Sequence, residues 1–295
     1  MPKSYKKWIF IALLSLIWGS SFILIKKSLL GFEPLHLGGL RIVFAASLLV
    51  VIGFKSLRRI GRKDWKWVIA AGFLSSFFPP FFFALAQTEI DSGVTSIFNS
   101  LAPLLTAVVG MLFFGVVIAK KQLLGVGVGL FGTGVFIYTG AEFNPDQNYW
   151  YAIFIMLSTL GYAFNINIIK KHLAHLSSLS VTTGSFAAVL PPTLVVLYVA
   201  GIQSVSWTTT AMYWPVVWLL VLAFFGTALA SLLFNKLISI SSPVFAASVT
   251  YTIPLVAIFW GIWDGEHISL YQLLGGAIVL CGVYLVNKKK KAAVN

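Results

Sequence analysis

Apolar runs about as long as a bilayer is thick recur along the whole chain, and they constrain its fold more than any other feature. A helix needs about 20 consecutive apolar residues to cross the hydrocarbon core. Of the 295 residues, 59% are hydrophobic and only 10% are charged. Because backbone polar groups in lipid must be paired within each span, continuous runs favour helices over alternating barrel strands. The sequence therefore predicts an all-α polytopic membrane protein.

The runs predict ten transmembrane helices, separated by short charged turns or by turns that contain Gly or Pro. The first five are predicted over residues 6–29, 34–54, 65–88, 92–115 and 121–140. The second five are predicted over residues 149–169, 178–200, 214–237, 243–263 and 269–287. We therefore expect two units of five spans each, residues 1–140 and 141–295.

An internal repeat relates the two halves. The stretch Gln122-Leu123-Leu124-Gly125 recurs 150 residues later as Gln272-Leu273-Leu274-Gly275. Each copy follows an apolar run with a proline in its middle, Pro103 and then Pro254. Because each half has an odd number of spans, the copies must lie upside down relative to each other, an arrangement typical of transporters. The predicted fold is two inverted five-helix repeats around a central cavity.

The charges predict the orientation of these spans. Eighteen of the Lys and Arg residues fall on one side of the map, whereas only Lys26 and Lys27 fall on the other and Arg41 lies within a span. By the positive-inside rule, both termini are expected in the cytoplasm. The net charge of +13 therefore indicates orientation and contact with anionic lipid rather than nucleic-acid binding. The first apolar run is too long for a signal peptide and is expected to remain as the first span.

Several chemistries find no support in the sequence. Cys281 is the only cysteine, which excludes an intramolecular disulfide and a multi-cysteine metal site. The chain has no H-E-x-x-H motif, no G-x-S-x-G motif and no P-loop. We therefore expect no enzyme activity, no metal, no cofactor and no transport driven by ATP within this chain. The absence of Asp and Glu near the centre of the predicted spans also disfavours proton antiport of cationic drugs.

The order of several motifs resembles a known family. They are Trp18-Gly19-Ser20-Ser21-Phe22, the segment from Pro34 to Arg41, Ala102-Pro103, and Asp264-Gly265-Glu266. Over roughly residues 8–287 the chain resembles the drug/metabolite transporter superfamily, and specifically its EamA-type ten-span permeases. The resemblance implies a carrier in a bacterial inner membrane that exports amino acids or related metabolites. One departure is Gly115-Val116, because such permeases often have Gly-Glu before the fifth span as well.

Polar and aromatic residues near the middle of the predicted spans are the candidate substrate-binding residues. Spans one, three, four, six, eight and nine are expected to surround the cavity. The candidates are Trp18, Asn99, Tyr162, Asn165, Tyr251 and Arg41. Facing lipid would leave the asparagine and arginine groups without partners, so they should face protein, water or substrate. They could instead bond between helices, and Arg41 could pair with Glu33 or Glu89 or reach the interface.

Proline and glycine mark further positions. Pro79, Pro103 and Pro254 are candidate hinges, because a proline cannot donate to the carbonyl four residues earlier. They could also contact the substrate or only serve packing. The glycines of spans five and ten predict close packing of these helices against each other, or alternatively a dimer interface; they are Gly125, Gly129, Gly132, Gly275 and Gly282.

The hypothesis from the sequence is an exporter or uniporter of small neutral or zwitterionic metabolites, with amino acids as the leading substrates. It would work by alternating access, as a monomer or a homodimer, and its partners would be the small-molecule substrate and membrane lipid. The alternative is a membrane sensor or assembly factor that transports nothing. That alternative predicts a centre filled by side chains.

Overall fold

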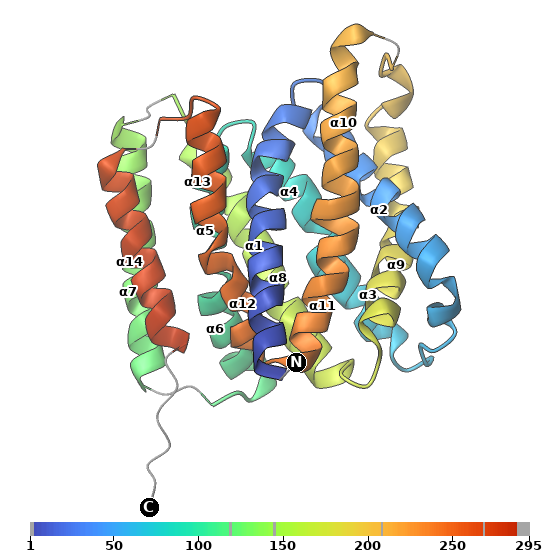
Figure 1. Cartoon of the computed structure of the whole chain (residues 1–295), viewed down its shortest axis with the longest axis horizontal. Helices are drawn as coiled ribbons and strands as arrows, with labels where there is room; N and C mark the ends of the chain where they lie inside the picture. The colour runs from blue at the N-terminus through green and yellow to red at the C-terminus, as the bar shows by residue number, and fades with distance from the viewer. Residues whose placement is uncertain (1–2, 118–119, 144–145, 208, 268, 288–295) are drawn as a thin grey trace, which may run out of the picture.

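The computed structural model describes residues 3–117, 120–143, 146–207, 209–267 and 269–287, and every regular element within them is helical. The long helices stand side by side in one bundle (Figure 1). Helix α1 begins and helix α14 ends at the same end of this bundle. The prediction of an all-α fold is confirmed for this part of the chain.

The helices follow the predicted spans closely. The first half contains α1 (Lys3–Ser28), α2 (Pro34–Leu57), α3 (Trp65–Gly72), α4 (Phe78–Ala86), α5 (Ser92–Asn99), α6 (Ala102–Phe114) and α7 (Lys120–Phe143). The second half contains α8 (Ala152–His172), α9 (Ser178–Val199), α10 (Tyr213–Val221), α11 (Ala230–Ile240), α12 (Pro243–Ala247), α13 (Ile253–Trp263) and α14 (Leu270–Asn287). Short 3-10 turns lie at Tyr149–Tyr151, Ile202–Ser204 and Thr210–Met212.

Eight continuous helical segments are long and apolar enough to cross a membrane, so the chain is a multi-pass membrane protein. They are Lys6–Ser28, Pro34–Leu57, Trp65–Ala86, Ser92–Phe114, Tyr149–His172, Ser178–Val199, Thr210–Ile240 and Pro243–Trp263. The two remaining predicted spans fall in α7 and α14. A count of ten spans, and the inverted relation of the halves, therefore stay predictions.

Four of these segments are interrupted near mid-length, at positions that recur about 150 residues apart. A π-helical stretch, η1 (Phe73–Phe77), separates α3 from α4, and another, η5 (Leu222–Leu229), separates α10 from α11. A turn separates α5 from α6, and the 3-10 stretch η6 (Ser248–Tyr251) precedes α13. Such interruptions are frequent at functional sites.

The three candidate hinge prolines stand directly after these interruptions. Pro79, Pro103 and Pro254 each occupy the first turn of a helix, in α4, α6 and α13 respectively. A proline fits there because first-turn N–H groups have no helical partner in any case. At Pro103 and Pro254 the chain therefore ends one helical stretch and starts another after a turn, whereas at Pro79 the helix continues directly from the π-helical stretch.

Helices α7 and α14 lie side by side at one edge of the bundle (Figure 1), and their glycines explain the close approach. A Cβ on Gly282 would lie 2.3 Å from the backbone nitrogen of Gly129, and a Cβ on Gly132 would lie 2.6 Å from that of Val279. Only residues without a side chain allow backbones to come this close. The prediction that glycines pack the two helices within the chain is confirmed for Gly129, Gly132 and Gly282.

Apolar packing forms two large clusters at different depths. One is centred on Phe98, Ile155 and Leu219, and the other on Leu14 and Ile166. Trp18 packs against both clusters, so it lies at the level between them.

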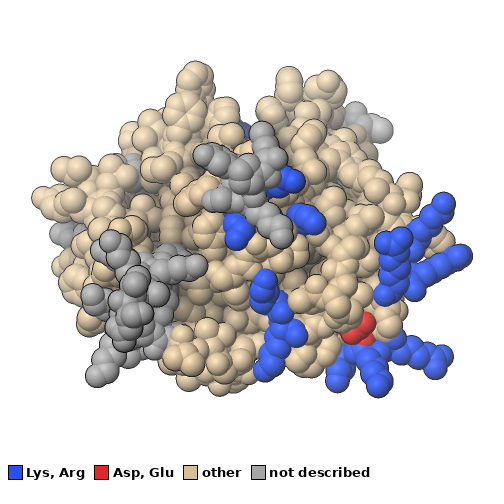
Figure 2. Space-filling model, turned by 60° about the horizontal axis from the view of Figure 1, so that its bottom comes forward, with Lys and Arg blue, Asp and Glu red and all other residues tan. Residues whose placement is uncertain are grey.

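The two ends of the bundle differ in charge. Figure 2 shows the end at which α1 begins, where Lys and Arg side chains gather with few acidic ones. Lys26 and Lys27 lie at the opposite end of α1, where both form salt bridges with Asp264.

Candidate functional site

A cavity opens among the helices at the level between the two apolar clusters. Its lining comes from α1, α2, η1, α4, α5, α6, α8, α9, η5, α11, α12 and η6. The six spans predicted to surround the cavity all contribute, and α2 and α9 contribute as well. The predicted central cavity is therefore present, and a centre filled by side chains is not what the described residues form.

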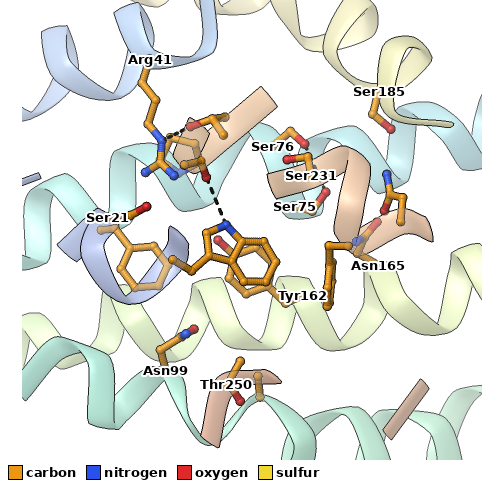
Figure 3. Close-up of a pocket in the computed structure, with 18 of the residues that line it drawn as sticks. Ser21, Arg41, Ser75, Ser76, Asn99, Tyr162, Asn165, Ser185, Ser231 and Thr250 are labelled. Carbon is orange, nitrogen blue, oxygen red and sulfur yellow. Dashed lines mark hydrogen bonds between the residues drawn. The ribbon is translucent and has the colours of Figure 1, made fainter. Parts of the chain in front are cut away.

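Arg41 reaches this cavity from α2 (Figure 3). Its Nε donates to the Thr227 hydroxyl at 2.5 Å, and that hydroxyl donates to the Leu222 carbonyl oxygen at 3.0 Å. Its terminal nitrogens have no hydrogen-bond partner among the described residues, and it forms no salt bridge with Glu33 or Glu89 there. No Asp or Glu belongs to the described lining. The guanidinium is therefore a partly buried positive charge with no counter-charge in the described cavity lining.

Asn99 and Asn165 bring unpaired amide oxygens to the wall. The side chains lie on α5 and α8, with 5% and 2% of the residue surface exposed. The Oδ1 atom of each is buried without a hydrogen-bond partner. An unsatisfied buried polar group costs about 1–3 kcal/mol, so such atoms in a cavity wall point to a ligand that donates to them.

Tyr162 and Trp18 complete the predicted set within the cavity. The Tyr162 ring stacks on Phe83, and its hydroxyl has no protein hydrogen bond within the described chain. Trp18 donates from Nε1 to the Gly226 carbonyl oxygen at 3.1 Å, and its ring meets the Phe234 ring edge-on. Because its only donor is used, Trp18 offers the substrate its ring and not a hydrogen bond.

Tyr251 is the one predicted residue that the structure places elsewhere. It packs against the cluster of Leu101, Leu104 and Val279, whereas its neighbour Thr250 lines the cavity. Both residues belong to η6, in which successive side chains are turned by about 120°. The cavity wall is formed here by Thr250, and contact of Tyr251 with the substrate stays a prediction.

Sequence reasoning missed most of the hydroxyl groups in the wall. They are Ser21, Ser75, Ser76, Thr182, Ser185, Thr227, Ser231 and Thr250, to which the amide of Asn235 is added. Spacings of three or four residues, as in Thr182 with Ser185 and Ser231 with Asn235, were the available signal. The signal is weak because Ser and Thr bond to the carbonyl four residues earlier in any membrane helix, as Thr182 does to Ser178.

Beyond the cavity, Glu266 ties the two halves together at the end of α1 that carries Lys26. Its side chain is fully buried, and it accepts hydrogen bonds from Lys26 Nζ at 2.9 Å and from Gly93 N at 3.0 Å. It also accepts from the backbone nitrogen and the hydroxyl of Ser92, at 3.1 and 2.7 Å. Ser92 and Gly93 open α5, so the carboxylate compensates the positive N-terminus of that helix.

Two further acids surround this contact. Burial alone would raise the pKa of Asp264, but the hydrogen bonds from Lys27 and Lys26 outweigh it and hold that pKa below its usual value. Burial, together with the nearby charge of Glu266, raises the pKa of Asp91, which accepts a hydrogen bond from Gln147. We call Lys26, Lys27, Ser92, Asp264 and Glu266 the Lys26 cluster. It adjoins Ile25, which lines the cavity.

At the opposite end, the one salt bridge among the described residues joins His175 to Asp64 at 3.1 Å, and it is more exposed than the contact of Lys26 with Glu266. Lys170 near the end of α8 donates to the carbonyl oxygens of Ser241 at 2.7 Å and Ile238 at 3.4 Å. Gly115 and Gly265 both adopt a left-handed backbone conformation, with φ of 71° and 86°, at the ends of α6 and α13. The residue after the first is Val116, whereas the residue after the second is Glu266.

Comparison with known proteins finds transporters that match nearly the whole chain. The EamA-like transporter family matches residues 6–138 and 149–288. An "Uncharacterized transporter" of Archaeoglobus fulgidus is 27% identical over 97% of this chain and 100% of its own length. The "Uncharacterized inner membrane transporter YedA" of Escherichia coli K12 is 26% identical over 94% of this chain and 89% of its own.

Two more distant similarities bear on substrate and fold. A Salmonella typhimurium protein named "Probable amino-acid metabolite efflux pump" is 23% identical over 94% of this chain and 93% of its own. A solved crystal structure superimposes with a TM-score of 0.68, covers 96% of each chain and is 15% identical. At that identity the structural likeness concerns the fold alone.

Proposed function

The chain belongs to the EamA-like transporter family, and from that premise we propose that this transporter carries amino acids across the membrane by alternating access. The family matches cover both halves of the chain. A relative named for amino-acid metabolite efflux supports amino acids as the substrate class. The sensor or assembly factor that the sequence left open predicts a centre filled by side chains, whereas a carrier requires a cavity; the cavity therefore favours transport.

The observation that carries the substrate proposal is the unpaired guanidinium of Arg41. A partly buried charge within a membrane span is costly without a counter-charge, and the described cavity lining supplies none. The carboxylate of an amino acid would supply it, and a guanidinium can bind a carboxylate through two parallel hydrogen bonds. The unpaired Oδ1 atom of Asn99 and the Tyr162 hydroxyl can accept from the ammonium group, and we also propose Asn165 as a substrate-binding residue. We propose that Trp18 contacts the substrate through its indole ring.

For the transport cycle we propose ten spans in two inverted five-helix repeats, residues 1–140 and 141–295. The repeated positions of the helix interruptions and the two family matches support this arrangement. We propose Pro79, Pro103 and Pro254 as hinges, because each lies in the first turn of a helix that follows an interruption and lacks the N–H for a helical hydrogen bond. The halves would rock about the cavity, exposing it to each side in turn.

We propose a bacterial inner membrane as the location, with both termini in the cytoplasm. The name of the Escherichia coli relative supports the inner membrane. The gathering of Lys and Arg at the end where α1 begins (Figure 2) supports the orientation, because basic residues are retained on the cytoplasmic side.

The test uses the purified chain in proteoliposomes and compares labelled amino acids with their carboxamides, which lack the carboxylate. We expect saturable flux of amino acids and little flux of the amides. Arg41→Met should raise KM at least about tenfold, since a hydrogen bond to a charged group contributes about 1.5–3 kcal/mol. The KM of Arg41→Lys should lie between those of the wild-type chain and Arg41→Met, because lysine keeps the charge and loses the paired donors.

A matched control is Arg58→Met, which removes an exposed arginine outside the cavity and should leave KM unchanged. The absence of saturable flux for every amino acid would exclude the proposed substrate class. An Arg41→Met protein with unchanged KM would show that the carboxylate binds elsewhere.

A further inference from the structure

Polar side chains gather in the cavity at a distance from Arg41. Arg41 lies about 10 Å along α2 from its start at Pro34, and Asn165 lies about 10 Å along α8 from its end at His172. These helix ends lie at opposite ends of the bundle. Figure 3 shows Asn165 with Ser75, Ser76, Ser185 and Ser231 on one side of the cavity, while Arg41 and Ser21 lie on the other.

We name this second group the distal polar subsite. It consists of side chains from η1, α8, α9 and α11, namely Ser75, Ser76, Asn165, Thr182, Ser185, Ser231 and Asn235. Two members are already paired, because Asn235 Nδ2 donates to the Thr182 hydroxyl at 2.8 Å. Ser185 donates to the Val68 carbonyl oxygen at 3.2 Å. These bonds fix the walls of the subsite and hold α9 against its neighbours.

Other members have hydrogen-bonding capacity that the protein does not use. The Oδ1 atom of Asn165 is buried without a partner, in a residue that is 2% exposed. The hydroxyl of Ser231 lines the cavity and forms no hydrogen bond with any described residue. An acceptor and a hydroxyl, both unused, can together bind one group that donates and accepts.

The charge of the subsite defines that group further. Arg41 is the one charged side chain in the described lining, and it lies at the other side of the cavity. A second ionic group on the substrate would have no counter-charge in the subsite and would lose its hydration. An aliphatic group would leave the Asn165 oxygen and the Ser231 hydroxyl unpaired. A neutral carboxamide or hydroxyl satisfies both at no charge cost.

We infer that the distal polar subsite binds an uncharged hydrogen-bonding group on the substrate side chain, so that the preferred substrates are polar, uncharged amino acids and not aliphatic ones. This inference rests on the proposed function, in which Arg41 holds the carboxylate. Glutamine is the natural probe because its unbranched side chain carries a carboxamide far from the carboxylate. Methionine is the matched comparison, since it has a similar length and no comparable donor.

The experiment measures kcat/KM for labelled glutamine and methionine in proteoliposomes. We expect the wild-type ratio to favour glutamine by at least about tenfold, because an unpaired buried polar group costs about 1–3 kcal/mol. Asn165→Leu keeps a similar shape and should bring the ratio close to one while methionine flux persists. Ser231→Ala should lower the ratio in the same direction. Ser47→Ala is the control, since this serine donates to Val43 within α2 outside the cavity lining.

The outcomes separate the two proposals. Equal transport of glutamine and methionine by the wild-type chain overturns the subsite and leaves the amino-acid transporter intact. A glutamine preference that survives both Asn165→Leu and Ser231→Ala also overturns it. The absence of saturable flux for both amino acids and for all others would instead overturn the proposed function, and the subsite with it.

Discussion

Replacing Glu266 with Gln should release the contact between the two halves at the Lys26 end. The buried carboxylate accepts hydrogen bonds from Lys26, Ser92 and Gly93. All three donors belong to the first half of the chain, whereas Glu266 belongs to the second. Opening the cavity toward this end by rocking the halves apart must therefore break these bonds.

The magnitude follows from the number and kind of these bonds. Gln keeps the shape of Glu but loses the charge, and its NH₂ group would face an N–H or ammonium donor where an oxygen had accepted. A hydrogen bond to a charged group contributes about 1.5–3 kcal/mol. Losing one such bond, about 2 kcal/mol, should change the ratio of closed to open conformers about 30-fold, since 1.4 kcal/mol corresponds to a factor of ten.

Thiol accessibility measures this ratio directly. A Cys281→Ala chain has no cysteine, and Ser21→Cys then places a single thiol in the cavity wall. A membrane-impermeant maleimide is added on the side of the membrane that carries Lys26. If opening is fast relative to labelling, the labelling rate is proportional to the open fraction. Glu266→Gln should then be labelled about 30-fold faster than its parent.

The matched control is Glu33→Gln, because Glu33 is exposed and forms no salt bridge within the described chain. Its labelling should change by no more than about twofold, as is usual for surface substitutions. A Glu266→Gln protein labelled at the rate of this control would refute the reasoning that the Lys26 cluster holds this end closed.

Two further predictions concern stability. Gly282→Ala should destabilise the chain by about 1–3 kcal/mol and lower its melting temperature in detergent, because the new Cβ would lie 2.3 Å from the backbone of Gly129; Gly127→Ala, with nothing within 4 Å of its Cβ, should not. Asp264→Asn should lower the melting temperature near neutral pH, because the lowered pKa of Asp264 stabilises the fold above the usual value of 3.8. That difference should disappear as pH falls through the lowered pKa, and a difference that persists in acid would contradict the role assigned to the carboxylate.

The fold was readable from the sequence because lipid imposes a simple rule on it. A span must be apolar over about 20 residues and must satisfy its own backbone, so the helix boundaries followed from the runs alone. The interruptions were less accessible. Pro79 marked η1, but η5 has no proline within it. A Cβ on Gly226 in η5 would lie 2.5 Å from the Ser21 hydroxyl oxygen, a contact with α1 that no local pattern displays.

The candidate site was predicted in part. Asn99, Asn165 and Arg41 stood out because amide and charged groups are costly in lipid, and all three line the cavity. The hydroxyl groups of the distal polar subsite did not stand out in the sequence, because serine is as common in helix contacts as in binding sites. Glu266 was recognised as part of a motif, but its partners Lys26 and Ser92 are 240 and 174 residues away. Contacts at such separation depend on the tertiary fold.

The unequal ends of the bundle have a consequence for how the carrier fills. At the end opposite the Lys26 cluster, Lys170 bonds only to carbonyls of its own half, and Val116 stands where the second half has Glu266. The one described salt bridge between the halves there joins His175 to Asp64 and is largely exposed, and exposed ion pairs contribute little. Under the proposed alternating access, we therefore expect the conformer open toward the Lys26 side to be the rarer one. Apparent affinity falls in proportion to the fraction of molecules that can bind. A solute arriving from the basic end, where α1 begins, would therefore half-saturate the carrier at a lower concentration than the same solute arriving from the Lys26 end. Glu266 would be the residue responsible for the difference between these two concentrations.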